Sequence, residues 1–340
     1  MSLEQVGASV PVEKKQKFTL KNGMQLAGIL LLLLLPLVLQ EQDFLVDTLI
    51  MIALWGFVAS AWNIVGGYGG MLSLGHAAFF GIGAYTSTIL FVKYGVSPWI
   101  GIMAGAVVAG LFGLFIGAVT LRLHGPFFSL CTIAVAEVLM IIAINWHSLT
   151  HGSGGIPVPF RPGAVNMMFD NKVTYFYLAV ALLAIPYGLS RWMNRSHFGY
   201  YLIGVRENEQ AALALGISSV KIRLIAMVIS SSLTAMGGTF YAQYIGIVEP
   251  LHEFSFQLSA QIALMAIIGG IGTAGGPIFG AALITLLGTV LRSTLGGAQG
   301  GVQAVVYGLL LVVVVLVIPQ GIVPWFNRFM AKRKRGSVHA

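Results

Sequence analysis

The chain has 340 residues, of which 57% are hydrophobic and only 9% are charged, and its mean hydropathy is +0.88. This composition indicates a membrane protein, and the solid runs of Leu, Ile, Val, Ala and Gly exclude a transmembrane barrel, whose strands alternate over ~10 residues. The net charge of +8 comes from basic residues that flank apolar runs, which we attribute to membrane anchoring and not to nucleic-acid binding. The single cysteine, Cys131, excludes an intrachain disulfide and a cysteine-based metal cluster.

Ten apolar runs come near the ~20 residues that cross a ~30 Å hydrocarbon core. They predict transmembrane helices at 24–39, 44–65, 71–92, 98–121, 126–146, 173–190, 224–248, 257–273, 277–295 and 301–319. The predicted fold class is an all-α polytopic membrane protein with eight to ten complete crossings, the lower numbers applying if 71–92 and 257–273 contain half-helices. Residues 24–319 then form the transmembrane domain, between a polar N-terminal tail, 1–23, and a basic C-terminal tail, 320–340.

Basic residues are distributed unevenly between the two sides of this topology. With the N-terminus inside, four basic residues lie outside, namely Lys93, Arg161, Lys172 and Arg292. The other fifteen lie inside, namely Lys14, Lys15, Lys17, Lys21, Arg122, Arg191, Arg195, Arg206, Lys221, Arg223, Arg328, Lys332, Arg333, Lys334 and Arg335. Because cytoplasmic loops carry an excess of Lys and Arg, we predict that both termini are cytoplasmic.

Two long loops interrupt the apolar runs. The external loop, 147–172, is rich in Gly and Pro. This density of turn formers argues against a buried strand and predicts an ordered, irregular surface loop that could dock a partner. The cytoplasmic loop, 191–223, is basic and contains a charged segment, 206–216, between long apolar runs.

Glycines cluster at 66–70 and again at 269–276. One interpretation is close helix packing, because small residues let helices approach one another in a membrane. The other is a broken helix that lines the translocation route, since unwound backbone is tolerated there only against protein or a water-filled cavity. On the second interpretation Gly269, Gly270 and Gly272 are candidate pathway residues. No strand precedes these glycines and no Gly-Lys-Ser or Gly-Lys-Thr follows them, so we predict that the chain binds no nucleotide itself.

Ser73, His76 and Glu137 are the polar candidates for the pathway. Glu137 is the only acid near the middle of a predicted span, and lipid exposure of an acid there costs about 2.5–3.5 kcal/mol or more on insertion scales. It is predicted to face the bundle interior, either as a pathway or gating residue or as a carboxyl hydrogen-bonded across helices. His76 either faces the pathway or packs against a neighbouring helix. Several acids at one depth would indicate a proton relay, and only Glu137 is present.

Motifs for catalysis or metal binding are missing from the sequence. We find no Ser-His-Asp, His-Glu-x-x-His or paired-carboxylate arrangement, and His147 and His151 have no carboxylate nearby at metal-ligand spacing. We therefore predict a transport protein, not an enzyme, and no cofactor or metal on this chain. An ion-coupled secondary transporter is the competing class, but it requires coupling-ion ligands for which only Glu137 is a candidate.

The charged segment 206–216 predicts a short helix. Asn208 is a good N-cap and Gly216 a good helix stop, and two acids lie near the positive end of the helix dipole. Helical spacing places Ala211 with Leu215 and Ala212 with Gly216, which gives a small-residue patch flanked by charge. Such a surface suits a groove on another protein. The alternative is a solvated loop between helices.

This segment resembles a motif of ABC importer permeases. Gln210-Ala211-Ala212-Leu213-Ala214-Leu215-Gly216 is similar to Glu-Ala-Ala-x-x-x-Gly, although Gln210 replaces the acid, Glu209 precedes it by one position, and the hydrophobic-Pro ending is missing. The resemblance implies a cytoplasmic coupling helix that contacts ATPase subunits. The coupling residues that it implies are Arg206, Glu207, Asn208, Glu209, Gln210, Ala211, Ala212 and Gly216.

Longer segments resemble the branched-chain amino-acid ABC permeases over roughly 45–320, and most closely their M-type subunit. The similar segments are Gly66-Gly67-Tyr68-Gly69-Gly70 continuing through Ser73-Leu74-Gly75-His76-Ala77-Ala78-Phe79-Phe80 to Tyr85, His124-Gly125-Pro126-Phe127-Phe128, Leu149 to Pro157, and Gly269-Gly270-Ile271-Gly272-Thr273. The resemblance implies a bacterial inner-membrane importer of leucine, isoleucine and valine, in which this chain forms half of the translocation pathway. Urea and short-chain amide permeases are close relatives and are the alternative.

The same resemblance implies the partners of the chain. They are a related H-type permease subunit, two cytoplasmic ATPases that bind ATP and Mg, and an external solute-binding protein. Closure of the ATPases would be transmitted through 206–216 to the helices on either side of the loop. Selectivity would then reside largely in the binding protein.

Overall fold

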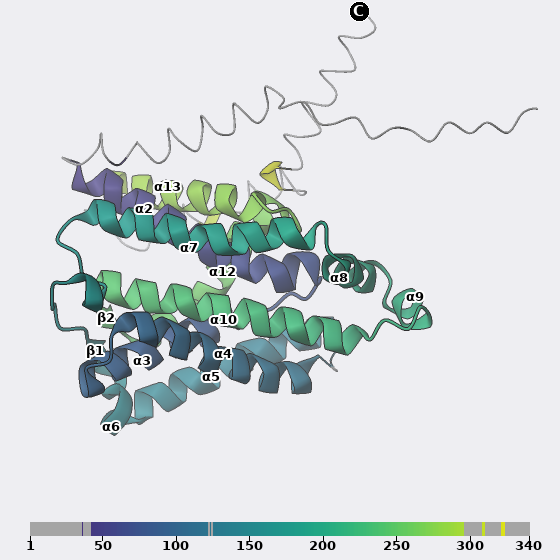
Figure 1. Ribbon diagram of the computed structural model, residues 1–340, viewed down its shortest axis with the longest axis horizontal. Helices are drawn as coiled ribbons and strands as arrows, with labels where there is room; N and C mark the ends of the chain where they lie inside the picture. Colours follow the sequence, from purple (N-terminus) through teal and green to yellow (C-terminus); the bar gives the residue numbers. More distant parts are fainter. Residues whose placement is uncertain are drawn as a thin grey trace, which may run out of the picture.

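The computed structural model describes residues 36, 42–121, 123, 125–295, 308–309 and 321–323. The long helices among these residues lie roughly alongside one another (Figure 1). Two short helices, α8 (His197–Glu207) and α9 (Glu209–Ala214), project from one end of the bundle, and a two-stranded sheet lies at the other (Figure 1). We call these the α9 end and the sheet end.

Five of the described helices are long and apolar enough to cross a membrane. They are α2 (Asp43–Asn63), which continues into the π-helical turn η1 (Ile64–Tyr68), α4 (Pro98–Thr120), α5 (Pro126–Asn145), α7 (Lys172–Met193) and α10 (Ser219–Ile245). The bundle also contains α3 (His76–Tyr94), α12 (Phe256–Gly270) and α13 (Gly276–Leu295), and the short elements are α6 (His147–Thr150), η2 (Gly152–Gly154), β1 (Ile156–Pro157), η3 (Ala164–Asn166), β2 (Ile247–Val248) and α11 (Pro250–Glu253). This is the architecture of an all-α, multi-pass membrane protein, as predicted.

The predicted spans 44–65, 98–121, 126–146, 173–190, 224–248 and 277–295 correspond to helices, with ends that differ by a few residues. The prediction for 71–92 is wrong at its start, because 71–75 is not helical and α3 begins at His76. The prediction for 257–273 is wrong at its end, because α12 stops at Gly270. Its 15 residues span about 22 Å, which is less than a full crossing of ~30 Å. The predicted spans 24–39 and 301–319 lie outside the described residues, apart from Pro36 and 308–309.

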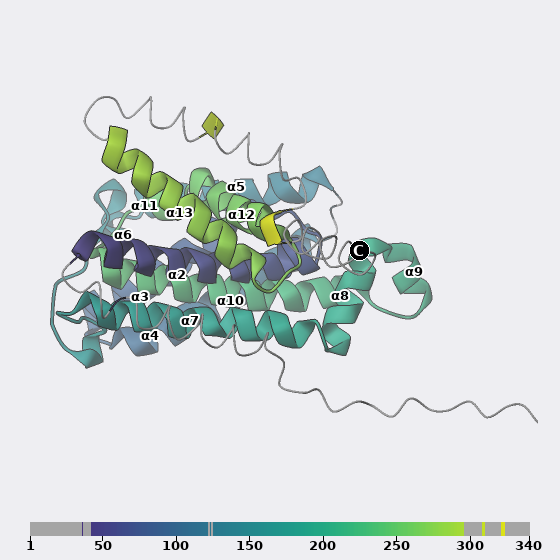
Figure 2. The same ribbon diagram turned by 90° about the horizontal axis from the view of Figure 1, so that it is seen from above.

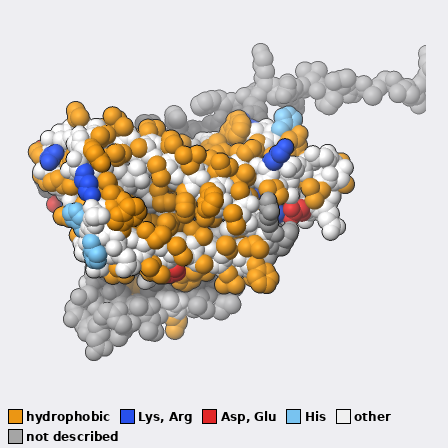
Figure 3. Space-filling model, turned by 90° about the horizontal axis from the view of Figure 1, so that it is seen from below, with side chains coloured by type: hydrophobic (Ala, Val, Ile, Leu, Met, Phe, Trp, Pro, Cys, Tyr) orange, Lys and Arg blue, Asp and Glu red, His pale blue; other side chains and the backbone are white. Residues whose placement is uncertain are grey.

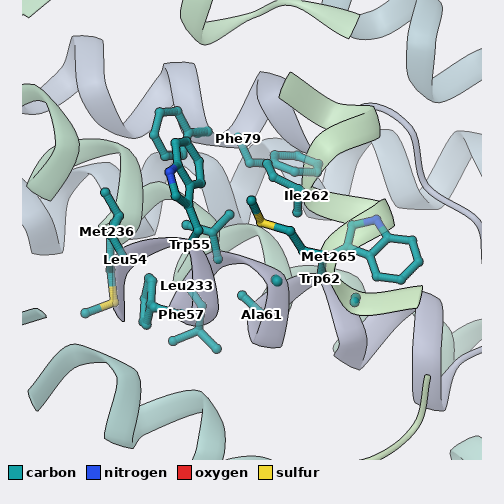
Figure 4. Close-up of a cluster of buried hydrophobic side chains, with 14 of the residues drawn as sticks. Leu54, Trp55, Phe57, Ala61, Trp62, Phe79, Leu233, Met236, Ile262 and Met265 are labelled. Atoms are coloured by element: carbon teal, nitrogen blue, oxygen red, sulfur yellow. The ribbon is translucent and has the colours of Figure 1, made fainter. Parts of the chain in front are cut away.

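The core of the bundle forms around α2, which contacts α7, α10, α12 and α13. Figure 2 shows α13 lying across α2. Large apolar side chains of α2 interlock with those of α3, α10 and α12 (Figure 4): Leu54, Trp55, Phe57, Trp62, Phe79, Leu233, Met236, Ile262 and Met265. In the most apolar 18-residue window of α2, and also of α10, 67% of the residues are buried, against 28% for α5. The centre of the bundle is therefore α2 and α10, and α5 lies at its periphery.

The outer surface of the bundle is apolar at its middle. Figure 3 shows hydrophobic side chains over the centre of one face, with basic and histidine side chains toward its two ends. On α4, Leu111 is 62% exposed and Phe115 is 65% exposed, and on α5 Leu130 is 61% exposed. Apolar side chains at this exposure are stable against lipid or another membrane subunit, which agrees with the multi-pass architecture.

Helices α3 and α10 approach each other closely at glycines. A Cβ at Gly238 would lie 2.0 Å from the carbonyl oxygen of Phe80, and a Cβ at Gly83 would lie 2.0 Å from that of Ala235. The Thr239 hydroxyl also donates a hydrogen bond to the Gly83 carbonyl (3.0 Å). Since lipid tails are as apolar as side chains, helices in membranes are held together by such close van der Waals packing and hydrogen bonds.

The sheet end is held by a strand pair and an ion pair. Ile156 pairs with Val248 and Pro157 with Ile247 in the antiparallel sheet. The prediction that the 147–172 loop contains no buried strand is therefore wrong, because Ile156 is only 2% exposed. Glycine at 155 permits this pairing. A Cβ there would lie 2.3 Å from the Val248 carbonyl oxygen, so only glycine allows the two segments to approach this closely.

Three helix ends also meet at the sheet end, on the carboxylate of Asp47. The Lys172 ammonium of α7 donates to this carboxylate at 2.8 Å, and the Tyr244 hydroxyl of α10 donates to its other oxygen. The interaction joins the second turn of α2 and the first turn of α7 to the last turn of α10.

Candidate functional site: the α8–α9 loop and the two helix breaks

The loop at the α9 end contains two helices that meet at Asn208. The backbone of Asn208 is extended (φ −154°, ψ 99°), which ends α8 at Glu207 and starts α9 at Glu209. The Asn208 side chain accepts a hydrogen bond from the Ala211 N–H (3.0 Å) and so caps α9, as predicted. The charged segment 206–216 therefore spans two helices, because Arg206 and Glu207 form the last turn of α8.

The end of α9 is a Schellman motif. Gly216 has φ +80°, its N–H donates to the Leu213 carbonyl (2.9 Å), and the Ile217 N–H donates to the Ala212 carbonyl (3.0 Å). The predicted stop at Gly216 is confirmed. Glycine is suited to this position because a left-handed backbone costs other residues roughly 1–2 kcal/mol.

The exposed surface of α9 is not the small-residue patch that the sequence predicts. Ala212 is 4% exposed, so it packs against its own chain, while Gln210, Ala211 and Gly216 are exposed. Glu209 is held by an ion pair of 2.9 Å with Arg223 at the start of α10. The exposed large apolar side chains of α9 and its C-terminal end are Leu213 (52%) and Leu215 (81%). Sequence reasoning did not select these two leucines, although an apolar residue near a helix stop in a polar loop was a usable signal.

Arg206 connects the loop to the interior of the bundle. Its Nη1 donates a hydrogen bond to the Gly67 carbonyl (2.7 Å) in the π-helical turn η1, while Nε and Nη2 donate to the Glu207 carboxylate (3.0 and 2.5 Å). A Cβ at Gly70 would lie 2.4 Å from Cγ of Arg206, and a Cβ at Gly272 would lie 3.2 Å from Nη1. Both glycine clusters therefore leave the space that this side chain occupies.

The two glycine clusters lie side by side, joined by Asn63. Its side-chain oxygen accepts from the Gly272 N–H (2.9 Å), and its side-chain nitrogen donates to the Thr273 carbonyl (3.0 Å). At the first cluster the helix widens into η1 and then ends, and at the second α12 ends at Gly270 and α13 begins at Gly276. Both clusters thus interrupt helices. The second also packs closely, because a Cβ at Gly269 would lie 1.8 Å from the Gly276 carbonyl oxygen.

His76 and Ser73 lie in the core, both fully buried. The Ser230 hydroxyl donates to the Ala61 carbonyl (2.7 Å), so it can only accept from His76 Nε2 (2.9 Å). Nδ1 of His76 then accepts from the Ser73 hydroxyl (2.8 Å). With both ring nitrogens bonded to neighbouring segments, His76 joins α3 to α10 in this conformation, which favours the packing interpretation.

The non-helical segment 71–75 is fixed by its neighbours. The Trp62 indole N–H donates to the Ser73 carbonyl (2.7 Å), the Ser129 hydroxyl donates to the Leu72 carbonyl (2.6 Å), and the Leu74 N–H donates to the Thr132 hydroxyl (3.1 Å). Side chains of α2 and α5 thus make hydrogen bonds with part of the backbone N–H and C=O groups that are left unpaired where η1 ends. A membrane interior requires such bonds because it contains no water to replace them.

A cavity of about 580 Å³ opens between this segment, the first turns of α5 and the α8–α9 loop. The described residues that line it are mostly apolar, and Glu209 and Arg223 are the charged ones among them: Gly70, Met71, Leu72, Leu74, Leu121, Leu123, Gly125, Pro126, Phe128, Ser129, Leu130, Ile133, Glu209 and Arg223. Because Glu209 belongs to α9, a movement of α9 changes the wall of this cavity directly.

Glu137 lies on α5, half-buried, one turn beyond the cavity-lining residue Ile133. Among the described residues the Glu137 carboxylate has no hydrogen-bond or ion-pair partner. One of the two predictions for Glu137 was a hydrogen bond to another helix. Glu137 makes no such bond with any described residue. Within the same part of the chain, no group of three or more His, Cys, Asp or Glu side chains is placed to hold a metal ion.

Comparison with known proteins defines the class to which this fold and loop belong. Residues 44–315 match the family described as the branched-chain amino acid transport system, permease component, and the chain belongs to this family. It is therefore a transport subunit and not an enzyme.

The chain is similar to particular members of this family. It is 27% identical over 340 residues to the high-affinity branched-chain amino acid transport system permease protein LivM of Escherichia coli K12, which covers 88% of this chain and 78% of that protein. LivM of Salmonella typhimurium is 27% identical over 315 residues, covering 86% of this chain and 72% of that protein. LivH of Escherichia coli K12 is 25% identical over 290 residues, covering 79% of this chain and 90% of that protein. No solved structure matches the chain.

Proposed function

We propose that this chain is one permease subunit of an ATP-driven importer of branched-chain amino acids, and that separate ATPase subunits drive it through α9. The observation that carries the coupling role is the contact of Arg206 with Gly67 (2.7 Å), because it joins the loop to the interior break in α2. The substrate class rests on the relatives named LivM and LivH.

The proposed assembly contains a second, related permease subunit, two ATPases that bind ATP and Mg, and a solute-binding protein. The ATPases would dock at the α9 end and the binding protein at the sheet end. Basic residues support this orientation, since five belong to the elements that form the α9 end: Arg191, Arg195, Arg206, Lys221 and Arg223. Under the positive-inside rule the α9 end is cytoplasmic, and we place both termini on that side.

The coupling step is a displacement of α9 when the ATPases close. Arg206 and the Glu209–Arg223 ion pair carry this displacement to two places, η1 with the Gly272 break and the wall of the cavity. Gly269, Gly270 and Gly272 act at the moving break, whereas Ser73 and His76 hold the neighbouring helices together. The leucines at 213 and 215 provide the apolar contact with the ATPase, flanked by Gln210 and Ala211. The helices then rock between two packings, which opens the pathway to the outside.

Transport measurements test this proposal. Vesicles containing this chain with its permease partner, ATPases and binding protein are expected to take up labelled leucine in an ATP-dependent manner. Collapsing the ion gradients is expected to leave uptake unchanged, and an ATPase-dead partner is expected to abolish it. Uptake of urea in place of leucine would retain the mechanism and replace the substrate class, and uptake that follows an ion gradient would contradict the proposal.

Replacing Gly216 with Val is expected to preserve assembly in the membrane and to lower transport-coupled ATP hydrolysis. The space at Gly216 is open, so the cost comes from the backbone, where φ +80° is strained by about 1–2 kcal/mol or more for a β-branched residue. Gly216→Asn is the matched control, because Asn tolerates the left-handed region. ATP hydrolysis stimulated by the loaded binding protein measures the effect. Equal stimulation in the Val variant and the wild type would show that the end of α9 does not take part in coupling.

A further inference from the structure

Glu137 lies at a depth where a lone carboxylate requires a partner. It is eight residues from the nearer end of α5, or about 12 Å at the rise of an α-helix. Around it on the exposed side of α5 are apolar side chains, with Val138 54% and Ile141 55% exposed. Acids at the centre of a membrane span face other protein or a water-filled path, since lipid does not solvate them. The half-buried Glu137 therefore marks a face of α5 that does not contact lipid.

This face of α5 continues into the cavity at the α9 end. Leu130 and Ile133 line the cavity, and Glu137 follows Ile133 by four residues, which places it on the same side of the helix one turn further into the bundle. A solute that leaves through the cavity thus passes along mostly apolar side chains and the Glu137 carboxylate. The cavity also borders Glu209 of α9, so it is connected to the coupling loop.

We propose that Glu137 receives the ammonium group of the amino acid while the solute crosses the membrane. This inference rests on the proposed function and adds to it the residue that contacts the solute. A branched-chain amino acid carries a cationic ammonium group and an apolar side chain, and the face of α5 offers a carboxylate beside Val138 and Ile141. The carboxylate replaces the water that the ammonium group loses on entering the membrane, through a charge-assisted hydrogen bond.

The chemistry of Glu137 favours an amino acid over a neutral solute. Urea and short-chain amides carry no charge. They can donate a hydrogen bond to the carboxylate, but they leave its negative charge uncompensated in the middle of the membrane, which is unfavourable. An amino acid supplies the opposite charge itself. The carboxylate also discriminates by sign, because it repels the carboxylate end of the solute and so orients the molecule in the pathway.

The test uses the complete transporter with Glu137→Gln, Glu137→Asp and the wild type. The Gln side chain keeps the size of Glu and removes the charge. We expect leucine uptake by Glu137→Gln to fall about tenfold or more, as for loss of a charge-assisted hydrogen bond, while ATP hydrolysis stimulated by the loaded binding protein is retained. Glu137→Asp is expected to recover part of the uptake. Ile142→Val, which changes a 45% exposed side chain on another side of α5, is the matched control and is expected to transport normally.

Three outcomes would overturn the assignment: normal uptake by Glu137→Gln, equal loss in the Asp and Gln variants, or loss of stimulated ATP hydrolysis together with uptake in an assembled complex. The last outcome would place Glu137 in coupling or packing instead of solute contact. The wild type separates this inference from the proposed function. If the wild type does not take up leucine, the proposed function fails, whereas leucine uptake that is insensitive to Glu137→Gln rejects only the inference.

Discussion

Arg206→Ala is expected to assemble with its partners and to lose most leucine uptake, by about tenfold or more, because a hydrogen bond from a charged group to a carbonyl is worth about 1.5–3 kcal/mol. The substitution removes the bond to the Gly67 carbonyl and empties the space beside Gly70 and Gly272. The displacement of α9 would then no longer reach the break in α2. Uptake and ATP hydrolysis are measured together, and we expect hydrolysis to continue without matching transport.

Two further variants isolate this effect. Arg206→Lys keeps the positive charge and an ammonium donor group but lacks the planar fork that contacts Gly67 and Glu207 at once, so an intermediate uptake is expected. Arg195→Ala removes an exposed basic residue of the same loop and is expected to transport normally. If the Arg206→Ala and Arg195→Ala variants transported equally well, the link from the loop to η1 would be rejected.

Leu215→Asp is expected to weaken binding of the ATPase subunits by about 2 kcal/mol, or roughly thirtyfold, which is the size found for interface residues that carry much of the binding energy. The Leu215 side chain is 81% exposed at the end of α9, and burying it against the ATPase is the apolar part of the proposed contact. An Asp there would have to be desolvated in the same place. The measurement is the amount of ATPase that copurifies with the permease in detergent.

The matched control for this variant lies at the opposite end of the molecule. Leu251 of α11, near the sheet, is 58% exposed, and Leu251→Asp is expected to leave ATPase copurification unchanged. Because both variants carry the same Leu-to-Asp substitution, a difference in ATPase copurification between them reports the position of the residue and not the added charge. Full copurification of the ATPase with the Leu215→Asp variant would show that the coupling contact is made elsewhere on the loop.

Hydropathy alone predicted most of the helices, because a membrane span must satisfy its backbone internally and present apolar side chains over ~20 residues. Its errors fell at glycines. Residues 71–75 and 271–273 are apolar enough to count as span, but they do not continue the helix. Hydropathy measures the side chains, whereas a helix break depends on which neighbouring groups satisfy the freed backbone. At the first break these groups are Trp62, Ser129 and Thr132.

The α8–α9 loop shows the same division between features that the local sequence determines and features that packing decides. The cap at Asn208 and the stop at Gly216 follow from local hydrogen bonds within a few residues, and both were predicted. The contact of Arg206 with Gly67 and the burial of Ala212 were not, because each depends on packing against other segments. Ala212 was assigned to an outer patch by helical spacing, and spacing shows which residues share a face but not which face is buried.

The sequence by itself determined a polytopic helical membrane protein, two glycine-rich interruptions and a capped polar helix between spans, since hydropathy and capping act over short stretches of chain. Tertiary structure decided which groups meet. Arg206 reaches Gly67 across 139 positions, and Asn63 reaches Thr273 across 210. It also placed Glu137 on a face of α5 without a partner among the described residues. Such pairings depend on how closely helices approach at their glycines, and this distance is set by all the packed side chains together.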